Sequence, residues 1–145
     1  MCFRWYLKAL SQKYATFSGR AHRTEFWCFM LFYLIGYISL LVIDYMIVVY
    51  YSILLGDIFL LIFTISLLYG VGLLSSSFLL ANLLPNIAVL VRRLHDIGRS
   101  GWWCLVCFIP GIGVIAVILF GLLAGSQKDN KYGKNPHNLK NINKG

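Results

Sequence analysis

Three long stretches without a charged residue constrain this chain more than any other feature of its sequence. They comprise 18, 34 and 25 residues and occupy residues 26–43, 58–91 and 102–126. A helix rises about 1.5 Å per residue, so roughly 20 apolar residues cross the hydrocarbon core of a bilayer, which is about 30 Å thick. The bilayer offers no water to backbone amides, and a crossing segment must therefore be helical. The sequence predicts an all-α integral membrane protein, with residues 26–43, 58–91 and 102–124 as its membrane segments.

The composition argues against a soluble protein. Hydrophobic residues make up 59% of the 145 residues and charged residues only 12%, which is about half the share usual in soluble proteins. A soluble chain of this length has too much surface to be covered by so few charges. The first apolar stretch begins only at Phe26 and no small-x-small cleavage site follows it, so we do not expect a cleaved signal peptide. We expect a single membrane domain, residues 1–145.

The positions of the basic residues predict the topology. No lysine or arginine occurs between residues 24 and 91, and all 13 lie in the segments before and after. Cytoplasmic segments of membrane proteins are enriched in Lys and Arg, so we expect a cytoplasmic N-terminus. The stretch between Asp44 and Asp57 then faces outward as a hairpin bounded by the two carboxylates. A second possibility is that Asp44 is a buried polar anchor.

The third segment, residues 102–124, has two possible paths. As a single span it would export the five lysines of the basic polar tail, residues 125–145. As a re-entrant hairpin, turning at residues 110–113, where proline and glycine suit a break in the helix, it would return them to the cytoplasm. Splitting residues 45–91 into two spans would strand Asp57 in lipid, at about 2.5–3.5 kcal/mol. We therefore expect three to four membrane helices and favour three.

An amphipathic helix is predicted before the first membrane segment, over residues 1–18. Apolar side chains recur every three or four residues and share one helical face; they are Phe3, Leu7, Leu10, Tyr14 and Phe17. Arg4 and Lys8 fall on the other side. A basic, aromatic-bearing helix of this kind is typical of the membrane interface. The same face could instead pack on the protein's own helices, and the pattern does not separate these possibilities.

The sequence VRRLHDIGRSGWW, residues 91–103, concentrates chemically active side chains. Guanidinium groups match phosphate oxygens bidentately, and His95 could titrate near neutral pH while Asp96 orients it. The candidate site for an anionic lipid or another ligand comprises Arg92, Arg93, His95, Asp96 and Arg99. The alternative, which we favour, is a cytoplasmic helix end whose arginines obey the positive-inside rule and are neutralised by Asp96.

Glu25 stands where the first membrane segment begins, close to Arg20 and Arg23 in the chain. We predict a structural ion pair among these three residues. We also predict that Glu25 meets Arg92 or Arg93, because those side chains lie at the same membrane face. Four tryptophans are expected to anchor the segments in the interface, where Trp is enriched; they are Trp5, Trp27, Trp102 and Trp103.

One face of the second membrane segment carries polar side chains. Ser75, Asn82, Asn86 and Arg93 are spaced so that they share a helical face. They could form a polar track toward the cytoplasm. Hydrogen bonding between helices is the better explanation, because polar side chains in membrane helices usually serve that purpose.

The four cysteines do not predict a metal or redox site. Cys104 and Cys107 form a lone CxxC in apolar surroundings, where nothing lowers a thiol pKa, and zinc normally needs four ligands. Cys2 and Cys28 also lie in or beside apolar sequence, so a disulfide framework is not indicated. We expect no metal site.

Three ordered motifs resemble a known protein family. They are WYLKAL with KYATFSGRAHRTEFW, then PNIAVLVRRLHDIGRSGWW, and finally NKYGKNP. From residue 5 to residue 136 they are similar to the signature of a bacterial inner-membrane family, domain of unknown function 805 or YhaH-like proteins. The chain departs from the usual family residues at His22, at Ile97 and at residues 134–136. The resemblance implies a small multi-pass protein of the bacterial inner (plasma) membrane and supplies no activity.

These observations favour a noncatalytic membrane binding or interaction protein with a basic cytoplasmic face. No nucleophile–base pair, metal cluster or nucleotide-binding loop is recognisable in the sequence, so we expect no enzyme activity, no catalytic residue and no cofactor. The expected partners are membrane lipids, especially anionic ones, and also a second copy of the chain or another membrane protein. Nucleic acid is not expected, because the basic residues are divided among three sites. The alternatives are an oligomeric transport or channel component and, less favoured, an enzyme that acts on an anionic lipid through His95 and Asp96.

Overall fold

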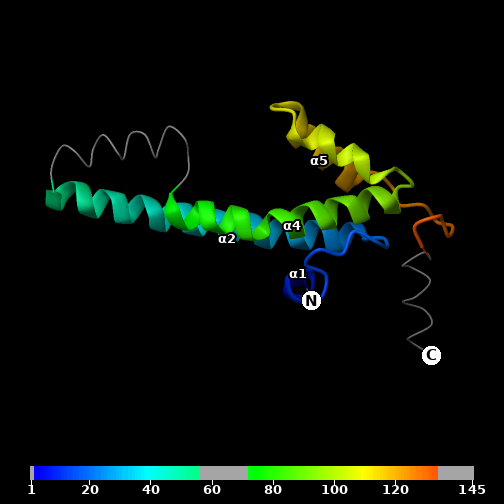
Figure 1. Cartoon of the computed structure of the whole chain (residues 1–145), viewed down its shortest axis with the longest axis horizontal. Coiled ribbons are helices and arrows are strands. Elements are labelled where there is room, and N and C mark those ends of the chain that lie inside the picture. Colours follow the sequence, from blue (N-terminus) through cyan, green and yellow to red (C-terminus); the bar gives the residue numbers. More distant parts are fainter. Residues whose placement is uncertain (1, 56–71, 134–145) are drawn as a thin grey trace. The chain divides into compact units, whose positions relative to one another are not determined.

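The computed structural model describes residues 2–55 and 72–133 and is shown in Figure 1. Regular secondary structure in these residues is helical, apart from one isolated β-bridge between Asn130 and Gly133. The elements are α1 (Cys2–Ser11), α2 (Arg23–Leu55), α4 (Leu73–Asp96), the 3₁₀ helix η1 (Gly101–Phe108) and α5 (Ile112–Leu122). The predicted all-α class is confirmed.

Two of these helices are long and apolar enough to cross a membrane. The apolar spans cover Arg23–Tyr51 in α2 and Leu73–Asp96 in α4. At about 1.5 Å per residue, the 33 residues of α2 extend about 50 Å and the 24 residues of α4 about 36 Å. The first helix continues well past residue 43, where the predicted segment ends. Of the predicted second segment, residues 58–71 lie outside the described residues, as does Asp57.

The chain divides into two compact units. One unit consists of Phe32–Leu83 and contains most of α2 with the first half of α4. The other combines Met1–Leu31 with Leu84–Gly145 and contains α1, the start of α2, the end of α4, η1 and α5. The second of these units, which we call the terminal unit, holds every lysine and arginine of the sequence.

In the unit Phe32–Leu83, Asp44 caps the N-terminus of α4. Its Oδ1 accepts the amide N–H of Leu74 at 3.2 Å, and its Oδ2 accepts that of Ser75 at 2.8 Å. The first amides of a helix have no partner within the helix, so a carboxylate there satisfies them. A side chain at Gly72 would collide with this carboxylate. Asp44 therefore does not bound an outer hairpin: α2 runs straight through it, and the buried-anchor possibility is the one observed.

The same two helices pack through an aromatic ring. Phe78 stacks on Tyr33 with ring centroids 5.7 Å apart. A methyl group at Gly36 would lie only 3.0 Å from Cζ of Phe78, so the absent side chain admits the ring. Asn82 is buried and donates to the carbonyl of Phe78 within its own helix at 2.9 Å. Ser75 and Asn82, two members of the predicted polar face, are thus engaged inside this unit.

In the terminal unit, α1 turns one side toward α2 and leaves its apolar stripe exposed. Ala9 is buried, and the ring of Tyr6 lies 5.5 Å from that of Phe29. Phe3 and Leu7, in contrast, are about half exposed. The helix ends at Ser11 and not at residue 18 as predicted. The exposed stripe is the feature expected of a helix that lies in the membrane interface.

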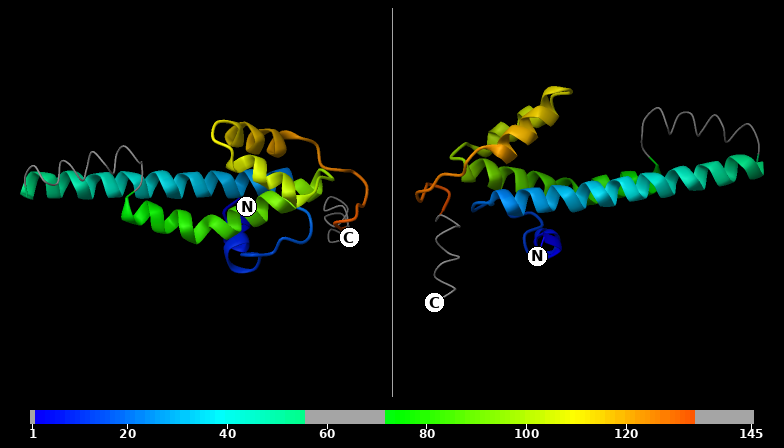
Figure 2. Two further views of the ribbon diagram at one scale, coloured as in Figure 1. Left: turned by 45° about the horizontal axis from the view of Figure 1, so that its top comes forward. Right: turned by 180° about the vertical axis from the view of Figure 1, so that it is seen from behind.

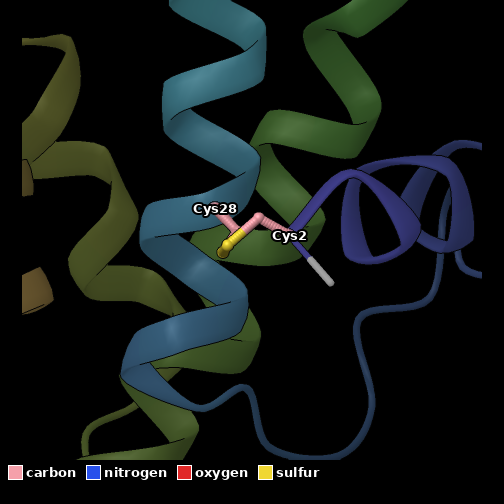
Figure 3. The surroundings of a disulfide bond; sticks show 2 residues. All are labelled: Cys2 and Cys28. Carbon is pink, nitrogen blue, oxygen red and sulfur yellow. A yellow bond between two sulfur atoms is a disulfide. The ribbon is translucent and has the colours of Figure 1, made fainter.

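A disulfide joins α1 to α2, which corrects the sequence-based interpretation of the cysteines. Cys2 and Cys28 are bonded, with their Cα atoms 5.1 Å apart (Figure 3). The two residues are 26 positions apart, and only the return of α1 onto α2 brings them together. The CxxC cysteines, Cys104 and Cys107, are free.

The third apolar stretch folds as a hairpin of η1 and α5, which lie side by side in Figures 1 and 2. The chain turns at Pro110 and Gly111, where Gly111 adopts a positive φ of 79° that favours glycine. A side chain at Gly113 would collide with the backbone carbonyl of Cys107, so the two arms touch through their backbones. Residues 102–124 are therefore not one continuous helix.

Candidate functional site

The candidate site lies at the end of α4, where glycine terminates the helix. The amide of Gly98 donates to the carbonyl of His95 at 3.1 Å, and that of Arg99 donates to Leu94 at 2.9 Å. This pair of bonds is the Schellman motif, and Gly98 has the positive φ, 79°, that the motif requires. The IGR sequence thus ends α4 abruptly and directs the chain into η1.

Four ion pairs converge on this helix end. Arg92 Nη1 lies 2.6 Å from Glu25 Oε1, and Lys13 Nζ approaches the same oxygen at 3.8 Å. Arg20 Nε lies 2.9 Å from Asp96 Oδ1, and Arg93 Nη1 lies 2.6 Å from Asp96 Oδ2. We call the buried members of this group the ion-pair cluster; they are Arg20, Glu25, Arg92, Arg93 and Asp96.

Burial makes these contacts costly to break. The side chains of Arg92 and Arg93 are at most 1% exposed, and those of their carboxylate partners about 5%. Removing one partner of a buried pair leaves an uncompensated charge, which typically costs about 3–5 kcal/mol. The cluster therefore holds together the segments that supply it, namely the loop before α2, the start of α2 and the end of α4.

Arg93 also closes the end of the C-terminal hairpin. It donates from Nε to the carbonyl of Phe120 at 3.1 Å and from Nη2 to the carbonyls of Gly121, at 3.4 Å, and Leu123. Arg23 adds a bond from Nε to Leu123 at 3.0 Å. The last carbonyls of a helix lack intrahelical partners and carry the negative end of its dipole, so guanidinium groups suit this position.

The segment that follows α5 returns to Asp96. The amide of Ser126 donates to the backbone carbonyl of Asp96 at 2.8 Å. Arg20 donates from Nη2 to the carbonyl of Ser126 and from Nη1 to that of Lys128, the latter at 2.9 Å. A side chain at Gly125 would collide with the Asp96 carboxylate. The beginning of the basic tail is thus held at the same end of α4 as the N-terminal segment.

His95 is covered by the turn at residues 130–133. Its ring stacks on that of Tyr132, with centroids 3.9 Å apart and an angle of 5° between the planes. Asn130 donates from Nδ2 to the carbonyl of His95 at 2.9 Å, and Lys131 lies over the Tyr132 ring. His95 Nδ1 is buried and has no hydrogen-bond partner among the described residues. The tail thus covers the motif, whereas residues 134–145 of the basic tail lie outside the described residues.

The structure separates the predicted ligand residues into buried and exposed members. Arg92, Arg93 and Asp96 are buried and engaged by internal partners, His95 is half-buried, and Arg99 is exposed with its guanidinium 5.6 Å from the Trp103 ring. The guanidinium forks of Arg92 and Arg93 therefore face protein atoms. One of these nitrogen atoms, Arg92 Nη2, is buried but has no hydrogen-bond partner among the described residues.

The predicted ion pair is confirmed for Glu25 and wrong for its two neighbours in the chain. Glu25 pairs with Arg92, one of the two distant arginines expected to meet it. Arg20 pairs with Asp96 instead of Glu25, and Arg23 binds the carbonyl of Leu123. Nearest neighbours in the chain are not the partners here, because the loop before α2 folds across the end of α4. Of the tryptophan anchors, Trp102 is the most exposed, Trp27 and Trp103 are partly exposed, and Trp5 is half-buried with Lys8 near its ring.

Lys13 sits at the edge of the cluster. Burial lowers the pKa of its ammonium group, while the neighbouring Glu25 carboxylate raises that pKa and Arg92 lowers it further. Its side chain is 31% exposed, which makes it the member of the group that solvent or a headgroup reaches most easily. The sequence alone contains no sign that Lys13 would join Glu25.

The buried ion pairs of this site hold segments of the chain together, and exposed basic side chains surround them. Each carboxylate is engaged by at least one guanidinium, so neither is available as a general base without breaking a buried ion pair. Among residues 2–55 and 72–133, no three His, Cys, Asp or Glu side chains gather as metal ligands would. Several basic side chains around the cluster are exposed; they are Arg4, Lys8, Arg23, Arg99, Lys128 and Lys131.

The motif lies within a region that matches a known protein family. A family model described as "Protein of unknown function (DUF805)" matches residues 14–134. The match includes the whole ion-pair cluster, the hairpin and the turn that covers His95. No solved structure matches the chain.

The similar proteins are bacterial membrane proteins. Inner membrane protein YhaI of Escherichia coli is 37% identical over 135 residues, which cover 92% of this chain and 95% of that protein. Inner membrane protein YhaH of the same organism is 37% identical over 132 residues, covering 91% and 95%. A shorter similarity, 32% over 81 residues, links the chain to the uncharacterized protein YiiR of Escherichia coli.

Proposed function

This chain belongs to the DUF805 family of inner-membrane proteins, and we propose that it acts as a noncatalytic membrane protein that binds anionic lipid headgroups through a basic surface. With two helices long enough to cross a bilayer and relatives named inner membrane proteins, it is an integral membrane protein. The basic surface consists of the exposed residues Arg4, Lys8, Arg23, Arg99, Lys128 and Lys131.

The observation that carries the proposal is the division of the basic residues into two groups. Arg20, Arg92 and Arg93 are buried and paired with Glu25 and Asp96. The remaining described basic side chains are exposed or half-buried, and all of them belong to the terminal unit. Basic residues close to an anionic membrane surface contribute about 1 kcal/mol each. The exposed group is therefore the set of basic side chains that headgroups can reach.

The orientation follows from the same group of residues. We place both ends of the described chain in the cytoplasm, with α2 and α4 as two spans, because Lys and Arg are enriched on that side. In support, Arg20 holds the carbonyls of Ser126 and Lys128, so that the N-terminal segment and the tail share one end of α4. The exposed stripe of α1 then lies in the cytoplasmic interface, with Arg4 and Lys8 directed toward the headgroups.

A catalytic role for His95 and Asp96 is not needed to explain the motif. Asp96 binds two arginines, and His95 packs under Tyr132. Both side chains thus have structural partners that account for their position at the end of α4. Replacing His95 with Gln should therefore leave the lipid composition of the host membrane unchanged; a changed composition would favour the enzyme alternative.

The test measures headgroup preference on the full chain. Purified protein is titrated with phosphatidylglycerol and, separately, with phosphatidylcholine, and bound lipids are counted by native mass spectrometry. The wild type should retain phosphatidylglycerol preferentially. A variant carrying Lys8→Gln, Arg99→Gln, Lys128→Gln and Lys131→Gln should lose that preference, by about fivefold in affinity per charge removed.

Two control variants distinguish the loss of positive charge from a general effect of substituting surface residues. Asp129→Asn removes a negative charge from the same exposed tail and should keep or strengthen the preference. Gln12→Ala changes an exposed polar residue without altering charge and should have no effect. Equal retention of the two lipids by the wild type, or an unchanged preference in the fourfold variant, would refute the proposal.

A further inference from the structure

The C-terminal hairpin, residues 101–122, exposes apolar side chains along both of its arms. On η1, Trp102 is 78% exposed and Phe108 61%; on α5, Val114 is 69% exposed and Ile115 60%. No charged residue occurs between Gly101 and Ser126. In water such a surface would be unfavourable by about 25 cal/mol for each Å² of apolar area exposed, so the hairpin needs an apolar environment.

The lengths of the two arms indicate how deeply the hairpin can enter a bilayer. The eight residues of η1 extend about 16 Å at about 2.0 Å per residue. The 11 residues of α5 extend about 16 Å at about 1.5 Å per residue. Each arm is thus about half as long as the hydrocarbon core of a bilayer is thick, roughly 30 Å. The hairpin is too short to cross a membrane but matches the depth of one leaflet.

Both ends of the hairpin are fixed at the polar end of α4. The first arm begins five residues after Asp96, beyond the turn at Gly98. The second arm ends under Arg93, which binds the carbonyls of Phe120 and Gly121, and Ser126 is then bonded to Asp96. Because the two ends share one anchor, the turn at Pro110 and Gly111, in the middle of residues 101–122, is the part of the hairpin that lies farthest along the chain from that anchor.

We propose that residues 101–122 insert into a single leaflet of the bilayer, with the turn at Pro110 and Gly111 near the midplane and both ends at the basic surface. The acyl chains of that leaflet then cover the exposed apolar side chains of the hairpin. Trp102 and Trp103 stand at the entry of the hairpin, the depth at which tryptophan is enriched. Arg99 over the Trp103 ring marks the boundary with the headgroups. This inference rests on the chain being in a membrane and is independent of any headgroup preference.

The backbone at the turn is suited to this position. Unsatisfied amides are costly in hydrocarbon. Pro110 has no N–H to satisfy. The amide of Ile109 donates to Val106 at 3.2 Å, and that of Gly113 donates to Ile109 at 2.8 Å. The close backbone approach of Gly113 to Cys107 keeps the two arms together, so the hairpin displaces lipid as one body.

Sided labelling of single cysteines tests the path. The four native cysteines are replaced by Ser, and Gln12→Cys, Ser100→Cys, Gln127→Cys or Tyr51→Cys is introduced. Intact spheroplasts and inverted vesicles are then treated with a membrane-impermeant maleimide. Positions 12, 100 and 127 should be labelled from the same face, and position 51 from the opposite face, which serves as the control for a true span.

Depth is measured at the turn. A spin label at Ile112→Cys in phosphatidylglycerol and phosphatidylcholine vesicles should report a position near the bilayer centre by oxygen and nickel-chelate accessibility. Labelling of positions 100 and 127 from opposite faces would show a single span and overturn the proposal. A label at position 112 that lies at headgroup depth would show a hairpin resting on the surface, and would overturn it as well.

A second measurement avoids the cysteine replacements. Green fluorescent protein and alkaline phosphatase are fused separately to the C-terminus of the wild-type sequence and, as the reference, to its N-terminus. A one-leaflet hairpin predicts the same side for both termini, with fluorescence and no phosphatase activity at either. Opposite sides would refute the inference while leaving the headgroup titration above intact, so failure of the hairpin and failure of the lipid-binding proposal are distinguishable.

Discussion

Arg20 donates from Nε to Oδ1 of Asp96 over 2.9 Å, although 76 residues separate the two in the chain. The second oxygen of Asp96, Oδ2, accepts a hydrogen bond from Arg93, so two guanidinium groups share one buried carboxylate. The other two nitrogen atoms of the Arg20 guanidinium group donate to the backbone carbonyls of Ser126 and Lys128. Through this pair the loop before α2, the end of α4 and the tail after α5 become one structural body.

Replacing Asp96 with Asn should destabilise the protein strongly. The substitution leaves the Arg20 and Arg93 charges buried without an anionic partner, which typically costs about 3–5 kcal/mol. Thermal unfolding in mild detergent should show a large fall in the midpoint temperature. The control is Gln12→Ala, at an exposed position, for which we expect no measurable change. Equal midpoints for the two variants would mean that Asp96 is not the centre of the cluster.

The pair of Glu25 and Arg92 should show strong energetic coupling. Glu25→Gln alone leaves a buried guanidinium uncompensated and should cost about 3–5 kcal/mol of unfolding free energy. The double variant Glu25→Gln with Arg92→Met should lose much less than the sum of the single variants, because the remaining charge is removed as well. The measurement is a double-mutant cycle in denaturing detergent. Additive effects would contradict a direct pair.

Asp44 should protect the first amides of α4 from hydrogen exchange. In Asp44→Ala the amides of Leu74 and Ser75 lose their acceptor, and loss of such a cap costs about 1–2 kcal/mol. Exchange at these two amides should accelerate in mass-spectrometric or NMR measurements, with little change in the terminal unit. Ser77→Ala, at an exposed position of the same helix, should leave them protected. Unchanged exchange in Asp44→Ala would show that another group satisfies the amides.

Gly121 should not tolerate a side chain. A methyl group there would lie 2.7 Å from Cζ2 of Trp27 and 2.8 Å from Cε1 of Phe26, closer than carbon atoms approach in proteins. Gly121→Val should therefore lower the unfolding free energy by about 1–3 kcal/mol and alter the fluorescence of Trp27. Leu122→Val, at the exposed neighbouring position, is the control. A fluorescence spectrum unaffected by Gly121→Val would place α5 elsewhere on α2.

The state of Cys2 and Cys28 reports the compartment of the N-terminus. Disulfides are rare in the bacterial cytosol because its thiols are kept reduced. With the proposed cytoplasmic N-terminus, rapid thiol trapping in cells should find both cysteines as thiols, and the bond present in the structure should form only when the purified protein is oxidised by air. Cys2→Ser is the control that abolishes the oxidised form. A bond already formed in cells would contradict the proposed orientation.

Residues of the motif show where sequence reasoning reaches its limit. The Arg and Asp spacing in RRLHD predicted a pair along the helix, and Arg93 with Asp96 is that pair. Nothing in the sequence indicates that Arg20 would share Asp96, or that Arg93 would cap α5 through the carbonyls of Phe120 and Gly121. Such partners are backbone or distant groups, which no local pattern encodes.

The hydrophobic pattern by itself determined that this chain is helical and belongs in a membrane, because lipid admits long uncharged segments only as hydrogen-bonded helices. Proline and glycine at residues 110–113 offered a break in the third segment as one of two paths, and the structure shows the chain turning there. The tertiary structure alone decided that Asp44 is an internal cap and not the edge of a loop, and that α2 runs on to Leu55. It alone decided which carboxylate each buried arginine meets. The physical reason is that secondary structure follows from the solvent and from neighbours within a few residues, whereas ion pairs across 67 or 76 residues exist only once the helices have packed.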